Sequence, residues 1–228
     1  MWGCIVLYLL TLAVNTRGVG SGGLLNFLSP SIEALFVFGA TGAIPVFRYG
    51  RWWTLLSAGW LHGGILHILF NMMSMRNVAP AISEMYGASR MVIIYTIAGV
   101  TGFAASTFIG GFLGPIPILG GGGITVGASA SILGLIGALV FYGRRTGSTM
   151  ITQQAKSWLF MLVIMGVFFR GIDNWAHLGG FAGGYATAKV LDPLRPERLD
   201  HLIAAVICLA VTGVAIAASV VTGRGFLP

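Results

Sequence analysis

Charged side chains are scarce in this chain: Asp, Glu, Lys and Arg make up 8% of its 228 residues, whereas 56% are hydrophobic. This composition lies far outside the range of ordinary soluble domains. No charged residue occurs between Met91 and Gly143, and a stretch of that length can hold two bilayer spans of roughly 20 residues each. The scarcity of charge therefore excludes a soluble domain and predicts a membrane protein that crosses the bilayer several times.

Acidic residues are the rarest of the charged ones, with 6 Asp and Glu against 13 Lys and Arg. All of them lie near the ends of apolar segments or in loops, whereas a transporter or channel would place carboxylates inside its spans or show an inverted repeat. The net charge of +7 does not indicate nucleic-acid binding, because the basic residues form no long run or stripe. The sequence thus favours neither a transporter nor a nucleic-acid-binding protein.

Cysteine is also rare, since only Cys4 and Cys208 are present, and both lie inside apolar stretches. Neither has neighbours at the spacing of a metal site. We interpret both as small buried hydrophobic residues, although the sequence leaves a disulfide open. We therefore expect neither a metal nor a cofactor.

A series of uncharged segments runs along the chain, and if each crosses the membrane once, there are seven spans. The first is interpreted as a span and not as a signal peptide, because it lacks a basic n-region and a clear cleavage site. The uncharged segments cover residues 2–14, 52–75, 91–112, 126–143, 157–169, 174–188 and 202–223.

Basic residues are distributed unevenly between the two sets of loops. If the spans alternate in direction, eight Lys and Arg residues fall on one face and five on the other. Because the more positive loops are usually cytoplasmic, the bias predicts a cytoplasmic N-terminus. The connections 15–51 and 110–123 then lie on the outer face. In the first of them, Ser29-Pro30 indicates the start of a short helix, and Trp52-Trp53 at its end are typical of the aromatic belt of a membrane protein.

Two polar side chains in the second segment share a helix face, since His67 and Asn71 are four residues apart. Such groups are costly in lipid, so we expect both to face the interior of the bundle. They could serve catalysis or form a hydrogen bond that holds two helices together, and the pair alone does not decide between these roles. The nearby His62 is expected to project elsewhere and to have a structural role.

Ser129 and His177 lie at the start of two apolar segments. A serine in a membrane helix commonly bonds to its own backbone, so Ser129 alone is weak support for catalysis. Just beyond His177, Gly180 and Gly184 form a face that lets two helix backbones approach closely. If this face packs on the helix of Ser129, the serine and the histidine come within hydrogen-bond reach, as a nucleophile and its base require.

These motifs, in this order, resemble those of the rhomboid intramembrane serine proteases, and the resemblance extends over nearly the whole chain. The family's Gly-x-Ser motif matches Gly127-Ala128-Ser129. Its catalytic histidine, followed by a glycine-rich face, matches His177 with Gly180 and Gly184. The family's function would therefore require Ser129 and His177 to act together.

The family's His-x-x-x-Asn motif matches His67 and Asn71. The resemblance implies that Ser129 attacks the scissile carbonyl and that His177 is the general base, without a third acid. It also implies that Asn71, His67 and the Ser129 backbone N–H stabilise the oxyanion. These roles are expectations that rest on the resemblance.

The resemblance further implies an all-α membrane protein: a rhomboid-like bundle of six core transmembrane helices within residues 1–200 and a seventh C-terminal helix within residues 201–228. The implied function is that of an intramembrane serine endopeptidase. It would cleave single-span transmembrane proteins in or near their transmembrane segments, in contact with the lipid bilayer and without a nucleic-acid partner. The expected location is a prokaryotic plasma membrane, because no long cytosolic domain and no organelle-targeting peptide is present.

Three positions depart from the family's pattern. Ala130 follows the serine where glycine is usual, Leu133 stands where an aromatic residue is frequent, and Trp53-Thr54 replaces a Trp-Arg pair. None of them removes a catalytic group. They leave an alternative open: a proteolytically weak or inactive rhomboid-like protein that binds transmembrane segments.

Overall fold

The computed structural model describes all residues except 17–18, 21–26, 115–122, 169–171 and 228. The described part is helical, with two isolated β-bridges, Gly20 with Ser29 and Thr41 with Thr125. An all-α membrane protein, as predicted, is therefore confirmed. Its α-helices are α1 (Trp2–Val14), α3 (Ile32–Phe38), α4 (Thr54–Ser57), α5 (Ile65–Tyr86), α6 (Ala88–Ala105), α7 (Gly111–Leu113), α8 (Ser129–Thr146), α9 (Thr149–Phe168), α10 (Asn174–Val190) and α11 (Leu199–Gly223).

Three helical stretches of the described chain are long and apolar enough to span a membrane by themselves: Ala88–Leu113, Thr149–Phe168 and Leu199–Phe226. A fourth results if α5 is counted together with the bent segment before it, and α1 is a shorter apolar helix. The segments predicted from the sequence correspond in order to α1, α5, α6, α8, α9, α10 and α11.

The prediction of one continuous span over residues 52–75 is wrong. The chain forms α4 and the 3-10 turn Ala58–Trp60, and then bends by 90° into α5. Gly64, with an extended backbone, is the N-cap of α5, which continues beyond the predicted end to Tyr86 with Pro80 inside it. Hydropathy reports how apolar the side chains are, and a window of apolar residues does not show where backbone hydrogen bonding is interrupted.

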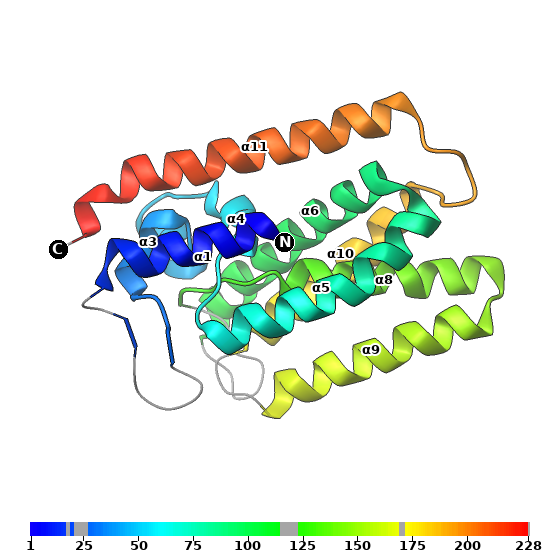
Figure 1. The fold of residues 1–228 in the computed structure, drawn as a ribbon, viewed down its shortest axis with the longest axis horizontal. Coiled ribbons are helices and arrows are strands. Elements are labelled where there is room, and N and C mark those ends of the chain that lie inside the picture. Colours follow the sequence, from blue (N-terminus) through cyan, green and yellow to red (C-terminus); the bar gives the residue numbers. More distant parts are fainter. Residues whose placement is uncertain (17–18, 21–26, 115–122, 169–171, 228) are drawn as a thin grey trace.

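Helix α8 forms the centre of the bundle, because it packs against α5, α6, α9 and α10. Its buried side chains, including Ile132, Ile136 and Leu139, belong to a core cluster with residues of α5, α6 and α10. Nearly all sides of α8 are therefore covered by other helices. By contrast, α9 and α11 lie along opposite edges of the bundle (Figure 1), and only 17% and 22% of their apolar windows are buried inside the protein.

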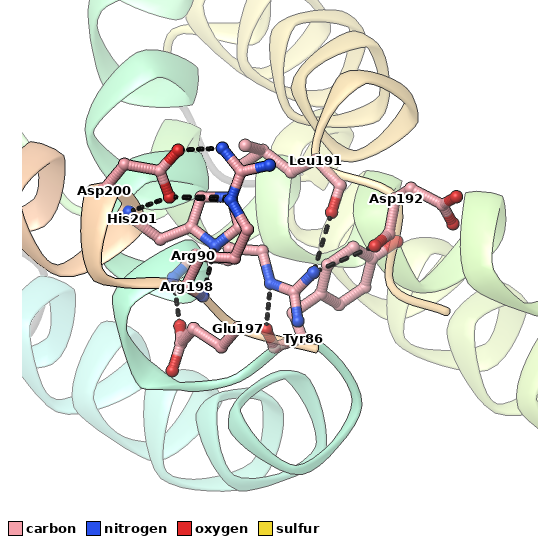
Figure 2. A network of polar contacts seen from close by, with 8 residues as sticks. All are labelled: Tyr86, Arg90, Leu191, Asp192, Glu197, Arg198, Asp200 and His201. Carbon is pink, nitrogen blue, oxygen red and sulfur yellow. Dashed lines mark hydrogen bonds and ion pairs between the residues drawn. The ribbon is translucent and has the colours of Figure 1, made fainter. Parts of the chain in front are cut away.

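A buried arginine joins the C-terminal ends of α5 and α10 to the segment before α11. Arg90, in the first turn of α6, is 3% exposed. It donates hydrogen bonds to the carbonyls of Tyr86 (2.5 Å), Leu191 (3.2 Å) and Asp192 (2.9 Å), and its backbone N–H donates to the Glu197 carboxylate at 3.0 Å (Figure 2). Arg90 therefore supplies donors to carbonyls at the C-terminal ends of α5 and α10, which lack partners within their helices.

A second buried arginine fastens α11 near the opposite end. Arg51 is 3% exposed, and its guanidinium donates to the carbonyls of Phe36 (2.6 Å) and Ser219 (2.7 Å). Burial lowers the pKa of Arg51. The Trp53 indole adds a hydrogen bond of 3.1 Å to the Ser219 hydroxyl. The loop before α4 is thus tied to both α3 and α11.

The short helix predicted after Ser29-Pro30 is α3, which begins at Ile32. Ser31 is its N-cap, because the Ser31 hydroxyl accepts the N–H of Ala34 at 3.1 Å. The two cysteines, Cys4 and Cys208, are both free in this structure.

Candidate active site

Ser129 is the first residue of α8, and the extended segment before it is held by backbone hydrogen bonds. Thr41 and Thr125 exchange two such bonds, of 3.1 and 2.7 Å, and the N–H of Gly127 donates to the carbonyl of Ala58 at 3.0 Å. Gly127 has a φ of +132°, which L-residues rarely adopt. The chain therefore turns sharply into α8 at Gly127, and Ser129 stands at a helix N-terminus, where the first N–H groups have no intrahelical partner.

His177 lies in the first turn of α10, and its side chain meets Ser129. The Nε2 atom of His177 is 2.8 Å from the Oγ atom of Ser129, although 48 residues separate them in sequence. The histidine backbone is held as well, since its N–H donates to the carbonyl of Asp173 at 3.2 Å. The structure thus brings together the two residues that the sequence suggested as nucleophile and base.

Glycines allow α10 to touch the backbone of α8. A Cβ atom at Gly180 would overlap the backbone of Ala130, and one at Gly184 would overlap the backbone of Gly134. Such contacts without intervening side chains bring membrane helices to their closest approach. Gly180 and Gly184 therefore line the contact between the helix of His177 and the helix of Ser129.

Two of the positions that depart from the family's pattern are accommodated in this packing. Ala130 is 1% exposed, and its methyl group lies 2.9 Å from where a Cβ atom at Gly102 of α6 would stand. The missing side chain at Gly102 therefore makes room for the methyl group. Leu133 is 3% exposed and belongs to the central core cluster.

His67 and Asn71 lie on α5, with Asn71 only 6% exposed. The Asn71 side-chain amide donates one of its two protons to the carbonyl of His67 at 2.9 Å. The Nδ1 atom of His67 accepts the backbone N–H of Gly63 at 3.3 Å. A neutral imidazole that accepts at Nδ1 carries its proton on Nε2, so His67 is set to donate from Nε2.

The space left by the absent side chain of Gly127 lies beside both His67 and Ser129. A Cβ atom at Gly127 would stand 2.6 Å from Nε2 of His67 and 3.8 Å from Oγ of Ser129. The missing side chain at Gly127 thus lets the His67 ring lie directly against the chain just before Ser129.

The expectation that His62 projects away from this site is wrong. His62 is fully buried, and its ring packs edge-on against the ring of His67, with 5.2 Å between the ring centroids. The 90° bend before α5 turns His62 back toward the helix that carries His67.

Sequence reasoning missed the contacts that surround His177 on its own helix. Asp173 is the N-cap of α10, and its carboxylate also accepts the hydroxyl proton of Ser106, which directly follows α6. Asn174 donates to the carbonyl of Gly166 on α9 at 2.8 Å. An Asp directly before an apolar run is an N-cap signal that could have identified Asp173, but the contact with Ser106 spans 67 residues and leaves no local pattern.

Comparison with known proteins identifies the family. The Rhomboid domain family model matches residues 49–193, from the loop before α4 to just beyond α10. Rhomboid protease GluP of Bacillus subtilis is 32% identical over 190 residues, which is 82% of this chain and 35% of that protein.

Two plant proteins with rhomboid names are similar to this chain to the same degree. RHOMBOID-like protein 4 of Arabidopsis thaliana is 32% identical over 72% of this chain and 40% of its own length. RHOMBOID-like protein 5 of the same plant is 32% identical over 75% of this chain and 53% of its own length. The chain thus spans about a third to a half of the length of these relatives. Because the matched segment is well over half of the chain and carries both Ser129 and His177, this protein belongs to the rhomboid family.

Proposed function

We propose that this protein is an intramembrane serine endopeptidase with Ser129 as nucleophile and His177 as general base. The observation that carries the proposal is the distance of 2.8 Å between His177 Nε2 and Ser129 Oγ at the start of two closely packed apolar helices. A serine hydroxyl is a weak nucleophile by itself, and a histidine within hydrogen-bond distance is what activates it. Among the relatives, the protein named as a rhomboid protease supports the same chemistry.

In the proposed reaction, Ser129 Oγ attacks the carbonyl carbon of the scissile peptide bond while His177 Nε2 accepts the hydroxyl proton. His177 then donates this proton to the nitrogen of the leaving segment, and the C–N bond breaks to leave an acyl-enzyme. A water molecule, deprotonated by His177, hydrolyses the ester and restores the Ser129 hydroxyl. The dyad needs no third acid if packing fixes the imidazole, and the contact between Gly180 and the Ala130 backbone holds the helix that carries His177 against α8.

We assign the oxyanion donors to His67, Asn71 and the backbone N–H of Ser129. His67 carries its proton on Nε2 because Nδ1 accepts the N–H of Gly63. Asn71 has a second amide proton beyond the one that it gives to His67. Each preorganised donor in a water-poor site can contribute on the order of 3 kcal/mol to transition-state stabilisation.

The substrate class proposed is a single-span membrane protein cleaved near the outer membrane face. Ser129 and His177 are both at the N-terminal ends of their helices, and the excess of basic residues at the opposite helix ends favours a cytoplasmic location for those ends. On the same reasoning we place the N-terminus in the cytoplasm. The membrane proposed is a prokaryotic plasma membrane.

Labelling by an electrophilic fluorophosphonate tests this function. Purified protein in detergent should be labelled at Ser129, and His177→Ala should abolish the labelling, because the hydroxyl then lacks its base. Ser131→Ala is the matched control: Ser131 lies two residues further on the same helix, is 2% exposed, and its loss should leave labelling unchanged. A folded parental protein that is neither labelled nor able to cleave a model transmembrane substrate would favour the inactive, segment-binding alternative.

A further inference from the structure

Asp173 holds the first turn of the helix that carries His177. Its Oδ1 atom accepts the N–H of Ala176 at 3.1 Å, and its backbone carbonyl accepts the N–H of His177 at 3.2 Å. Two of the N–H groups near the start of the helix are therefore bound by this one residue. The carboxylate is also favoured by the positive end of the helix dipole.

The second carboxylate oxygen of Asp173 reaches another helix. Its Oδ2 atom accepts the hydroxyl proton of Ser106, which is 1% exposed and begins the π-helical turn Ser106–Gly110 at the end of α6. Hydrogen bonds to a charged acceptor are stronger than neutral ones. The cap of α10 is thus itself fixed to α6, and α10 cannot turn about its axis at this end without breaking the contact.

The rest of the α6–α10 contact is rich in glycine, with side chains such as Thr101 and Phe103 set among the glycines. A Cβ atom at Gly102 would meet the carbonyl of Ala176, and a Cβ atom at Gly179 would stand 2.8 Å from the carbonyl of Thr101. Smooth backbone surfaces fix how close two helices come but provide few side chains to set their rotation. The hydroxyl of Thr101, which donates to the carbonyl of Gly179 at 3.1 Å, is one polar contact within this seam.

We infer that Asp173, anchored by Ser106, is a positioning residue that sets the orientation of His177 toward Ser129. The inference rests on the proposed function of the Ser129–His177 pair. Asp173 acts through the backbone of the first helical turn and takes no part in proton transfer. A misplacement of about 1 Å at a reacting group can slow a reaction roughly 10²-fold, so a loosened first turn is costly for catalysis even in a folded protein.

The test compares variants of the whole chain in detergent by the rate of fluorophosphonate labelling at Ser129 and by thermal unfolding. Asp173→Ala and Ser106→Ala should each label roughly 10-fold to 10²-fold more slowly than the parental protein. The double variant should be little slower than Asp173→Ala alone, because both changes remove one shared contact. With a transmembrane substrate, kcat should fall while KM stays unchanged. Asp173→Asn should restore most of the rate, since the amide oxygen still caps the helix and the amide N–H can donate to the Ser106 hydroxyl oxygen.

Ser31→Ala is the matched control. It also removes the N-cap hydrogen bond of a helix, here α3, and this cap lies far from Ser129 and His177 in the sequence. It should lower thermal stability without slowing the labelling. Hydrogen exchange at the amides of Ala176 and His177 should be faster in Asp173→Ala than in the parental protein.

Three results would overturn the inference while leaving the proposed function intact: parental labelling rates in Asp173→Ala, slow labelling in Asp173→Asn despite an intact cap, or slowing in Ser31→Ala equal to that in Asp173→Ala. A parental protein that is not labelled at Ser129 would overturn the proposed function, and the positioning of His177 with it.

Discussion

Gly184 of α10 lies directly on Gly134 of α8, so closely that a Cβ atom at position 184 would overlap the Gly134 backbone. This contact lies below the Ser129–His177 pair, about two helical turns further along α10 from His177. The distance between the two helices is therefore determined by residues that have no part in the chemistry.

Leucine at Gly184 should push α10 away from α8 and lower proteolytic turnover more than about 10-fold, because overpacking a tight contact costs roughly 1–3 kcal/mol and shifts the backbone. Insertion into the membrane should stay normal. Gly213→Leu on α11 is the matched control, since no atom lies within 4 Å of a Cβ atom there. Full activity of Gly184→Leu in a cleavage assay would contradict the packing described.

Alanine at Gly127 should lower turnover by roughly 10²-fold, comparable to the loss of one oxyanion donor. Its methyl group would stand 2.6 Å from Nε2 of His67, and the backbone φ of +132° is unfavourable for alanine. Gly147→Ala separates the two effects, because Gly147 also has a positive φ, of +73°, but open space around it. Cleavage rates and thermal unfolding should be measured for both variants. Equal losses of cleavage rate in the two would argue against a specific effect of the contact between position 127 and His67.

Asn71→Ala should fold normally and lower turnover by roughly 10²-fold, as the loss of a single oxyanion donor does in known serine proteases. Unfolding temperature and cleavage rate should be measured on the same preparation. If both fall together, Asn71 stabilises the helix through its bond to the carbonyl of His67, and the oxyanion assignment is wrong for this residue.

The membrane orientation predicts which tags are accessible. Tags inserted after Arg145 and after Arg198 should be protected from impermeant reagents added outside the cell, whereas a tag near Gly111 should react. The reverse pattern would place the Ser129 end of the bundle in the cytoplasm.

Arg51→Met should destabilise the protein, since it removes the hydrogen bonds that the buried guanidinium donates to the carbonyls of Phe36 and Ser219. The expected cost is roughly 1.5–3 kcal/mol for each hydrogen bond to a charged group that is lost. Arg48→Met, at an exposed position in the same loop region, is the control and should unfold like the parental protein. An unchanged unfolding temperature for Arg51→Met would mean that α11 is held by its apolar contacts alone.

Much of this architecture is predictable from local patterns. Uncharged segments mark the helices, and the spacing of Gly180 and Gly184 after His177 indicates a close helix contact from the sequence alone. These features are visible because each depends on residues within a few turns of one helix.

What escapes prediction depends on backbone geometry or on distant partners. The break before α5 lies within a continuous apolar stretch, so hydropathy cannot reveal it. The charge count that predicts the membrane orientation includes Arg51 and Arg90 as ordinary loop residues. In the structure both are buried, and both donate hydrogen bonds to backbone carbonyls. Their partners lie up to 168 residues away, a separation at which a single sequence carries no periodic signal.

The contact between Arg51 and Ser219 also has a consequence for the order of events during synthesis. Arg51 emerges from the ribosome 168 residues before Ser219 does. Until α11 has entered the membrane, one side of the Arg51 guanidinium and the Trp53 indole lack the acceptors that they have in the finished protein. The loop that leads into α5, and with it the setting of His62 and His67, is completed only when the last helix arrives. A nascent chain in which every proposed catalytic residue is already translated therefore still lacks the contacts that α11 makes with this loop.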